Sequence, residues 1–533
     1  MNSKNYPFIF YLILYSIVSL LSLTLFPAVH SDEVWLAGLT NDYINMHSIF
    51  ISESFFDLMP RTVHLIKALY HLLQIPYIQL IGYTIFSVRL LSLTAAIFVL
   101  WFYYQWLSST KYSYVLSLLG AIYLSTFSQF IYASHFARQE ILLLLVLILC
   151  LRIYQASKKN YIIVIGIILG LSIGLHPNSF IVASMIGTLL LWDLVKKNIT
   201  RQRFLLFVSI IGIFALFFVG VSLLVNPSFI SDYLNYGRTL NVDAPPSIRF
   251  DNFIDFYIKL YYQISGTYYI PNIRILLITG SLLSIYHLFL GYFTKTRILK
   301  HLVQNIDVRD HLHILLTWCF KLSLMAIAFN ITVFIIGRFN TTSILFLVIV
   351  FIAQLTLSIT VMINLFSSLS HTNISKILIL LFIVLILLNI RSVWHDYQLI
   401  EGHDYNRYEK SLNHYLDDDS IVLGNVSSGF IFKDTTFYDI RNLAFLDNMT
   451  IEKYITERNI NIIIYYEEYD YINRNPMWSI LYGEDRYYED LQQFLTEKAT
   501  LKGSIEDTFY GSRIIRYMGD YPWKIYVFEV NTD

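Results

Sequence analysis

The chain has 533 residues, of which 56% are hydrophobic and only 14% are charged. With a mean hydropathy of +0.54, this composition excludes an ordinary soluble globular protein. The 38 basic and 38 acidic residues cancel, so the net charge does not indicate nucleic acid or another strongly charged partner. We therefore expect a polytopic α-helical membrane protein.

Apolar windows long enough to cross a hydrocarbon core of about 30 Å recur up to about residue 393. The first follows Lys4 and, at roughly 20 residues, is too long for the apolar core of a secretory signal, so we interpret it as a retained helix. We count about eleven spans, at residues 8–27, 78–106, 112–131, 140–157, 161–175, 179–194, 204–225, 273–293, 314–337, 342–369 and 375–392.

Basic residues between the spans predict the orientation. Alternate connecting segments hold basic clusters such as Lys158-Lys159 and Lys196-Lys197, whereas the other segments hold most of the acids. Because basic loops stay in the cytoplasm, we expect the N-terminus inside and the long loops at about 28–77 and 226–272 outside. An integral protein of the plasma (inner) membrane of a prokaryote fits this pattern.

The C-terminal region, residues 394–533, follows an odd number of spans and should lie outside, as a soluble α/β domain beside a membrane domain at 1–393. Its short apolar runs have the length of strands, and one segment reads as a helix. The expected strands are 420–423, 460–466 and 523–530, with a helix at 451–458.

The first outside loop has an amphipathic pattern between Glu53 and Leu73. Apolar residues fall on one helical face, while His64, Lys67 and His71 fall on the other. This pattern is typical of a helix lying in the membrane interface, or of an ordinary amphipathic helix packed on the spans.

An acidic pair, Asp32 and Glu33, stands directly after the first apolar run. Carboxylates at a membrane surface are costly and usually functional. A carboxylate can also accept a proton from an attacking hydroxyl group. Both residues are therefore candidate catalytic groups, and the sequence leaves open which of the two is the base.

Several charged residues stand at the outer ends of predicted spans, on the same side as the acidic pair. Arg138 and Glu140 lie between the third and fourth spans, His176 ends the fifth, and Arg338 ends the ninth. One guanidinium group can donate two parallel hydrogen bonds to the oxygens of a phosphate. We therefore interpret this set, with Arg61 of the first outside loop, as a phosphate-binding site. The alternative is arginines that extend to lipid headgroups.

The sequence contains no metal-ligand motif. The 14 histidines show no HExxH spacing, and Cys150 and Cys319 both fall inside apolar runs, where we expect them to pack. We predict no required cofactor, although a divalent cation on the acidic pair stays possible. Tyr268 and Tyr269 in the second outside loop are candidates for stacking against a sugar.

The order of these motifs resembles the GT-C membrane glycosyltransferases, in the branch of protein O-mannosyltransferases and lipid A aminoarabinose transferases. The resemblance covers the first 200 residues and the surroundings of Arg338. It rests on the acidic pair, Ser87-Val88-Arg89-Leu90-Leu91-Ser92-Leu93, Ala137-Arg138-Gln139-Glu140, Gly170-Leu171-Ser172-Ile173-Gly174-Leu175-His176-Pro177 and Gly337-Arg338-Phe339.

This resemblance implies an inverting transferase that moves a sugar from a polyprenyl-monophosphate carrier to a protein, lipid or glycan acceptor at the outer membrane face. It maps the acid that acts at the acceptor onto Asp32, with Glu33 beside it, and the carrier-phosphate contacts onto Arg138 and Arg338. The chain departs from the aminoarabinose branch at His176, where a lysine is often found.

Two other functions compete with a transferase. A transporter or flippase of lipid-linked substrates would use the same arginines, but predicts internal repeats or charges at mid-membrane. Neither feature is visible in the sequence, although Lys321 lies inside the ninth predicted span. A scaffold or sensor built around the C-terminal domain would leave the grouping of Asp32 with Arg138 unexplained.

Overall fold

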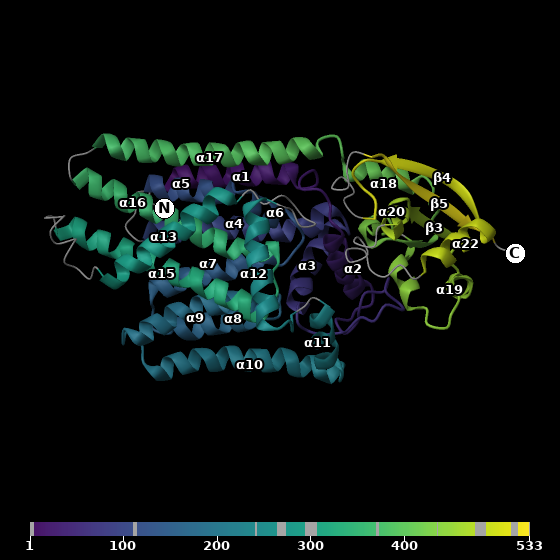
Figure 1. The fold of residues 1–533 in the computed structure, drawn as a ribbon, viewed down its shortest axis with the longest axis horizontal. Coiled ribbons are helices and arrows are strands. Elements are labelled where there is room, and N and C mark those ends of the chain that lie inside the picture. Colours follow the sequence, from purple (N-terminus) through teal and green to yellow (C-terminus); the bar gives the residue numbers. More distant parts are fainter. Residues whose placement is uncertain are drawn as a thin grey trace.

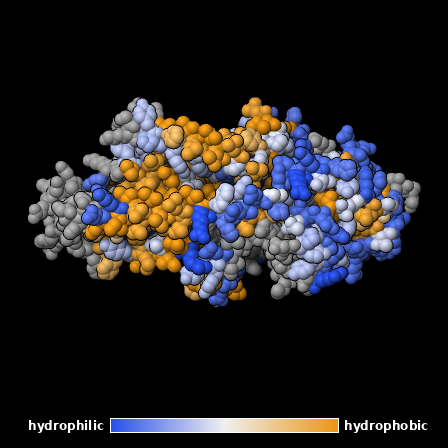
Figure 2. Space-filling view, turned by 90° about the horizontal axis from the view of Figure 1, so that it is seen from above, coloured by the Kyte–Doolittle hydropathy of each residue, from blue (hydrophilic) through white to orange (hydrophobic). Residues whose placement is uncertain are grey.

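The computed structural model describes residues 5–109, 114–239, 242–263, 273–293, 306–368, 372–433, 435–474, 487–512 and 521–531. A bundle of long helices forms one end of the molecule, and a smaller domain containing a sheet forms the other (Figure 1). Hydrophobic side chains cover most of the bundle surface in Figure 2, whereas the small domain is mainly hydrophilic. The expected fold class, a polytopic helical membrane protein with a C-terminal α/β domain, is confirmed.

Every window predicted as a span overlaps a helix. The helices of the membrane domain are α1 (Tyr6–Ser22), α2 (Ser31–Asn45), α3 (Ala68–Ile81), α4 (Ile85–Ser109), α5 (Tyr114–Ser125), α6 (Ser128–His135), α7 (Glu140–Ala156), α8 (Tyr161–Ser172), α9 (Ser179–Val195), α10 (Arg201–Val225), α11 (Phe229–Thr239), α12 (Pro246–Tyr261), α13 (Arg274–Phe293), α15 (Ile306–Ile336), α16 (Leu345–Ser368) and α17 (Thr372–Ile400).

Length and composition divide these helices into two groups. In the described part of the chain, five helices are long and apolar enough to cross a membrane, namely α4, α10, α15, α16 and α17. The pair α5 and α6, bent by 65°, makes a sixth candidate span, and α1, α8, α9 and α13 are apolar but shorter. Helix α16 is buried at the centre of the bundle, whereas α10 and α17 present exposed apolar side chains, as expected of lipid-facing helices.

Packing inside the bundle accounts for both cysteines. Cys150 on α7 and Cys319 on α15 are free and fully buried, as predicted. Around them, α4 packs on α7, and α15 packs on α9 and α16. The cysteine side chains therefore serve as small apolar groups of this core.

The predicted second span is interrupted at its start. Helix α3 ends at Ile81, Gly82 follows with φ +96°, and α4 begins at Ile85. Glycine adopts a positive φ without the steric penalty of a side chain. The chain therefore turns here, and only α4 continues as a long apolar helix.

The prediction of an amphipathic helix between Glu53 and Leu73 is wrong over most of its length, because residues 53–67 are not helical and α3 begins only at Ala68. Its backbone bonds to the bundle instead: the Leu65 N–H donates to Ser222 Oγ (3.0 Å) and the Leu69 N–H to the Gly174 carbonyl (2.9 Å). His71, expected on a polar face, is buried. Tertiary contacts therefore override the local helical pattern.

The C-terminal domain begins after α17, which continues past the predicted boundary at residue 393 to Ile400. Its sheet has the order β2-β1-β3-β5-β4, parallel over the first three strands and antiparallel over the rest. The elements are α18 (Tyr405–Asn413), β1 (Ile421–Gly424), β2 (Thr436–Asp439), α19 (Ile451–Glu457), β3 (Ile462–Tyr466), α20 (Glu468–Arg474), α22 (Tyr488–Lys498), β4 (Ala499–Asp507) and β5 (Trp523–Val530).

Three of these strands and helix α19 match the predicted elements, and β2 and β4 are additions. The domain is attached to the first long loop of the membrane domain. Asn442 accepts the N–H groups of Leu58 (3.3 Å) and Met59 (3.1 Å), and Arg458 Nε donates to Asp57 (2.6 Å). Helices α2 and α3 lie between the bundle and this domain, and α1 begins at the far end of the bundle (Figure 1).

Candidate active site

Helix α2 presents the acidic pair in its first turn. His30 caps the helix: its ring nitrogen accepts the Asp32 N–H (3.1 Å), and Glu33 accepts the His30 N–H (3.1 Å). This reciprocal arrangement is a capping box, and acids in the first turn also complement the positive end of the helix dipole. The Asp32 side chain is 36% exposed, whereas that of Glu33 is 0% exposed.

Glu33 forms a buried ion pair with Arg89 of α4. The guanidinium donates through Nε (2.8 Å) and Nη2 (2.7 Å) to the two carboxylate oxygens of Glu33. Its Nη1 donates to the carbonyls of Leu23 and Pro27, both at 2.9 Å. Arg89 is itself fully buried, so this pair joins the end of α1, the start of α2 and α4.

The same carboxylate also fixes the turn that carries Arg138, because it accepts the N–H of Ala137 (2.9 Å). With His30 and Arg89, the Glu33 oxygens therefore have four donors, which fills their capacity. No acceptor position is left on Glu33 for a substrate proton. Glu33 therefore fixes the positions of His30, Arg89 and Ala137 beside Asp32.

Arg138 joins Asp32 to Glu140. Its Nη1 donates to Asp32, while Nε (3.2 Å) and Nη2 (2.9 Å) donate to the two oxygens of Glu140. The Arg138 and Glu140 side chains are largely buried. Two predicted site residues, Asp32 and Arg138, are thus in direct contact, and Glu140 orients the guanidinium.

Three further basic residues lie near this pair. His176 stands in the turn between α8 and α9, Arg338 follows Gly337 at the end of α15, and Lys67 precedes α3. Burial lowers the pKa of His176 well below its usual range, and the charges of Lys67, Arg338 and Arg138 lower it further. A neutral imidazole among fixed positive charges is the expected state at neutral pH.

Lys67, which we predicted on the polar face of an amphipathic helix, lies among these basic residues. It adopts φ +93° as the N-cap of α3, a strained backbone for a residue with a side chain. Burial lowers its pKa to about 8, and the charges of Arg61 and Arg338 contribute. Within the described residues, neither Lys67 nor Arg338 forms an ion pair with a carboxylate.

Arg61 lies at the edge of this region and has its own partner. It donates to both oxygens of Glu53 (3.1 and 2.9 Å), and its guanidinium stacks on Trp35 at 4.6 Å. The pKa of the Glu53 carboxyl falls to about 2 although burial opposes this, because Arg61 stabilises the charged form. A direct phosphate contact by Arg61 stays a prediction.

The structure thus brings together Asp32, Arg138, Glu140, His176 and Arg338 at the end of the bundle that faces the C-terminal domain. Tyr268 and Tyr269 lie outside the described residues. No group of three metal-ligating side chains occurs in the part of the chain that the structure describes. Sequence reasoning missed the ion pair of Arg89 with Glu33 and the position of Lys67 near Arg338 and Arg138, although an arginine inside an apolar span indicates a buried partner.

Comparison with solved structures gives a match over nearly the whole chain. The crystal structure of ArnT from Cupriavidus metallidurans, determined with bound undecaprenyl phosphate, superimposes with a TM-score of 0.53 and 11% sequence identity, covering 98% of each chain. No protein-family model and no curated protein sequence matches.

The chain therefore has the fold of that structure, which agrees with the resemblance that the order of the motifs indicated. Among solved structures, it is similar to ArnT from Cupriavidus metallidurans across both the helical bundle and the C-terminal domain.

Proposed function

We propose that the protein is an integral membrane glycosyltransferase that takes a sugar from a polyprenyl-monophosphate carrier and passes it to an acceptor at the outer face of the membrane. The observation that carries this proposal is the contact between the partly exposed Asp32 and Arg138, beside Lys67 and Arg338, which have no carboxylate partner among the residues that the structure describes. The ArnT structure contains undecaprenyl phosphate, which supports a polyprenyl carrier for a protein of the same fold.

The cations suit the phosphate of the donor. Within the described part of the chain, no carboxylate pairs with Lys67 or Arg338, and an anion near Arg138 would compensate their positive charge. When the sugar leaves, the phosphate diester becomes a monoester and gains negative charge. Cations already aimed at that charge lower the barrier without rearrangement. In this scheme Arg138, Arg338 and Lys67 hold the phosphate, and His176 contacts it as a neutral hydrogen-bonding group.

Asp32 suits the role of base. The acceptor oxygen forms a bond to the anomeric carbon as the bond from that carbon to the phosphate oxygen breaks, and the hydroxyl proton moves to Asp32. A single displacement of this kind inverts the anomeric configuration. Glu33 has no free acceptor position, so we assign it to positioning and Asp32 to the role of base. The sugar is a hexose or a pentose, and no metal is needed.

The charge inside the ninth predicted span does not favour a transporter. Lys321 lies 3.8 Å from Asp193 and donates to the hydroxyl of Tyr154 (2.7 Å), which donates in turn to Asp193 (2.7 Å). This set is neutralised between three helices. It therefore supports a structural role for Lys321 rather than a coupling-ion site.

The proposal is tested by incubating the purified protein with a panel of polyprenyl-phosphate sugars. We expect release of polyprenyl phosphate from at least one donor, and we expect the release to depend on Asp32. Movement of the intact lipid across a liposome bilayer without release would favour the transporter and contradict the proposal.

A further inference from the structure

The C-terminal domain packs directly on the start of α2, the helix that carries Asp32. One hydrophobic core contains Val29 and Val34 from this part of the chain together with Phe430 and Tyr510 of the C-terminal domain. All four of these side chains are at least 95% buried. Helix α2 is therefore packed against the C-terminal domain as well as against α3 of the membrane domain.

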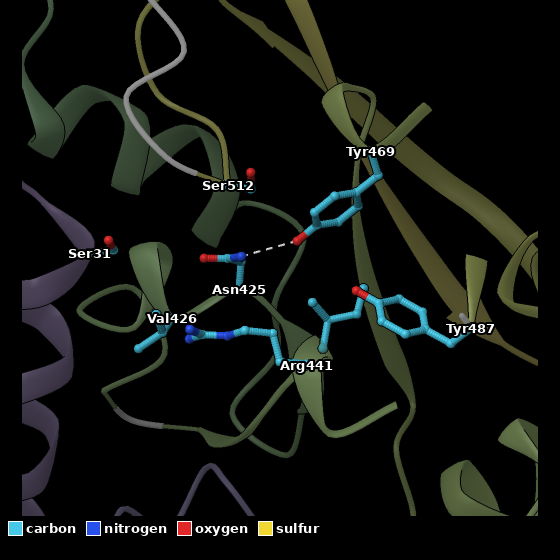
Figure 3. Close-up of a pocket in the computed structure, with 8 residues that line it drawn as sticks. Ser31, Asn425, Val426, Arg441, Tyr469, Tyr487 and Ser512 are labelled. Atoms are coloured by element: carbon cyan, nitrogen blue, oxygen red, sulfur yellow. Dashed lines mark hydrogen bonds between the residues drawn. The ribbon is translucent and has the colours of Figure 1, made fainter. Parts of the chain in front are cut away.

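Little space is left at this boundary. Ser31 of α2 lies with Asn425, Val426 and Arg441 of the C-terminal domain around a cavity of about 30 Å³ (Figure 3). That volume is the size of one or two water molecules. Close-packed surfaces transmit small changes of shape, so a change on the C-terminal domain should be felt by α2.

The chain on the N-terminal side of Asp32 contacts Tyr510. The Val29 N–H donates to the Tyr510 hydroxyl at 3.4 Å, and this bond is buried. Val29 directly precedes His30, whose ring caps α2 and accepts the Asp32 N–H. The C-terminal domain therefore holds the residue next to the cap of α2.

On the C-terminal side of Asp32, Gly429 permits a close approach to Val34. Gly429 follows the short 3₁₀ helix η3 (Val426–Ser428) and has an ordinary helical φ of −63°. A methyl group on Gly429 would lie 2.8 Å from Cγ1 of Val34, whereas carbon atoms in contact are about 3.5–4.0 Å apart. The absence of a side chain at Gly429 therefore allows Val34 to occupy its position.

Arg441 fixes a third residue of the helix, Trp35. Its guanidinium donates to both oxygens of the buried Asp439 (2.7 and 3.0 Å). It also lies over the rings of Trp35 at 5.1 Å and of Phe56 at 4.8 Å. Asp439 thus orients the guanidinium, and cation–π attraction holds the indole ring against it. Trp35 is three positions after Asp32, within one helical turn.

We propose that the C-terminal domain is a positioning element of the active site, in which Tyr510, Gly429 and Arg441 hold α2 on both sides of Asp32 and set the direction of its carboxylate. These three residues act on the reaction through α2. A displacement of about 1 Å in a reacting group can reduce the rate by about 100-fold, so the hold on α2 matters for the rate. This inference rests on the proposed glycosyltransferase function.

The first test compares Gly429→Ala with Gly424→Ala in the full-length protein in detergent. The new methyl group displaces Val34 in Gly429→Ala, whereas on Gly424, in β1, it meets no atom closer than 3.4 Å. We expect the single-turnover rate of sugar transfer to fall at least tenfold in Gly429→Ala and to stay native in Gly424→Ala, with donor affinity within twofold in both. Adding Val34→Ala to Gly429→Ala removes Cγ1 and should restore most of the rate.

The second test measures the hold on α2 without activity. Amide hydrogen exchange of Ser31–Asn45, followed by mass spectrometry, should become faster in Gly429→Ala and return towards the native rate when Val34→Ala is added. Arg441→Lys keeps a positive charge beside Asp439 but loses the planar guanidinium, so it should also speed exchange in α2 and slow transfer. This variant carries the test if Gly429→Ala does not fold.

Native transfer and native exchange of α2 in Arg441→Lys and in any folded Gly429→Ala would overturn the positioning role. A fall in donor affinity as large as the fall in rate would also overturn it, because the change would then not be specific to the base. Failure of Val34→Ala to restore Gly429→Ala would count against the contact. If native protein transferred no sugar from any donor, the proposed function would fail, while the exchange comparison would still decide whether the C-terminal domain holds α2.

Discussion

Arg89 donates two hydrogen bonds to the carboxylate of Glu33, and neither side chain is exposed to solvent. Glu33 is adjacent to Asp32 in the chain, and through the Ala137 N–H it also holds the residue before Arg138. One buried ion pair therefore fixes both the proposed base and the proposed phosphate ligand. It acts on the reaction only through these neighbours.

Removing one member of this pair should destabilise the protein strongly. Arg89→Met leaves a buried carboxylate without its counter-ion, which typically costs about 3–5 kcal/mol. We expect a large fall in the unfolding temperature measured in detergent, and Glu33→Gln combined with Arg89→Met should recover part of it. The control Lys502→Met removes a surface ion pair with Asp417 and should change stability by less than about 1 kcal/mol. An equal fall in unfolding temperature in Arg89→Met and Lys502→Met would contradict this structural role of the ion pair.

The importance of Arg89 was only partly accessible from the sequence. The run from Ser87 to Leu93 contributed to the family resemblance, and an arginine in an apolar helix indicates a buried partner. Neither observation identifies that partner, because Glu33 is 56 positions away and the sequence contains no distance between helices. For the same reason the sequence could not distinguish Asp32 from Glu33, whose different burial depends on how α2 packs.

Arg138→Ala should reduce turnover by about 30- to 1000-fold, because a cation that stabilises the leaving phosphate is lost, worth roughly 2–4 kcal/mol. Arg138→Lys should restore only part of the turnover, since an ammonium group cannot form the bidentate contact of a guanidinium group. The alanine variant also leaves Glu140 without its partner, so Arg138→Ala with Glu140→Gln is the matched control for folding. If that double variant regained native turnover as well as native stability, Arg138 would not belong to the site.

Lys67 should impose a pH dependence on use of the donor. With a pKa lowered to about 8, the amine is charged below that pH and loses its proton above it. We therefore expect kcat/KM for the donor to fall as the pH rises through about 8, because this parameter reports the free enzyme. Lys67→Arg stays charged and should keep its activity to higher pH. An unchanged profile in the arginine variant would show that another group titrates.

The same shift predicts that Lys67 lowers stability. A lysine whose pKa is depressed by folding destabilises the folded state most below the folded value, and this effect disappears as the pH rises towards the usual value of about 10.4. Lys67→Met should therefore raise the unfolding temperature at pH 7, and by less at pH 9.5, while it weakens donor binding. A variant that was less stable at pH 7 would contradict the assignment of Lys67 to an anion site.

The predicted topology places a tag at Lys197 in the cytoplasm and one at Asn448 outside. It rests on basic loops that alternate with mixed loops, and the structure places the C-terminal domain beyond the bundle end opposite the start of α1 (Figure 1). Cys150 and Cys319 are buried, so a single cysteine introduced at Lys197 or at Asn448 can be labelled selectively. Labelling of both from the same side of the membrane would contradict this orientation.

The sequence predicted the long helices well and the loops poorly. Apolar runs such as that of α10 have few alternatives once they are about 20 residues long. The segment from Glu53 to Lys67 instead follows contacts with partners far along the chain, such as Ser222, which override its amphipathic pattern. Strand β2 was missed because Thr436–Asp439 is short and only its last residue is buried, so it has no clear hydrophobic alternation.

The central claim is that Asp32 is the base of a sugar transfer. Asp32→Asn keeps the size of the side chain but cannot accept the acceptor's proton, so transfer should fall by about 100-fold or more, while donor binding persists. Glu33→Gln should instead reduce stability more than it reduces the transfer rate of the folded fraction. The decisive measurement is the single-turnover rate of sugar transfer from the active polyprenyl-phosphate sugar by purified Asp32→Asn protein. A loss of this size with bound donor is the predicted result, and transfer at the native rate would contradict the mechanism.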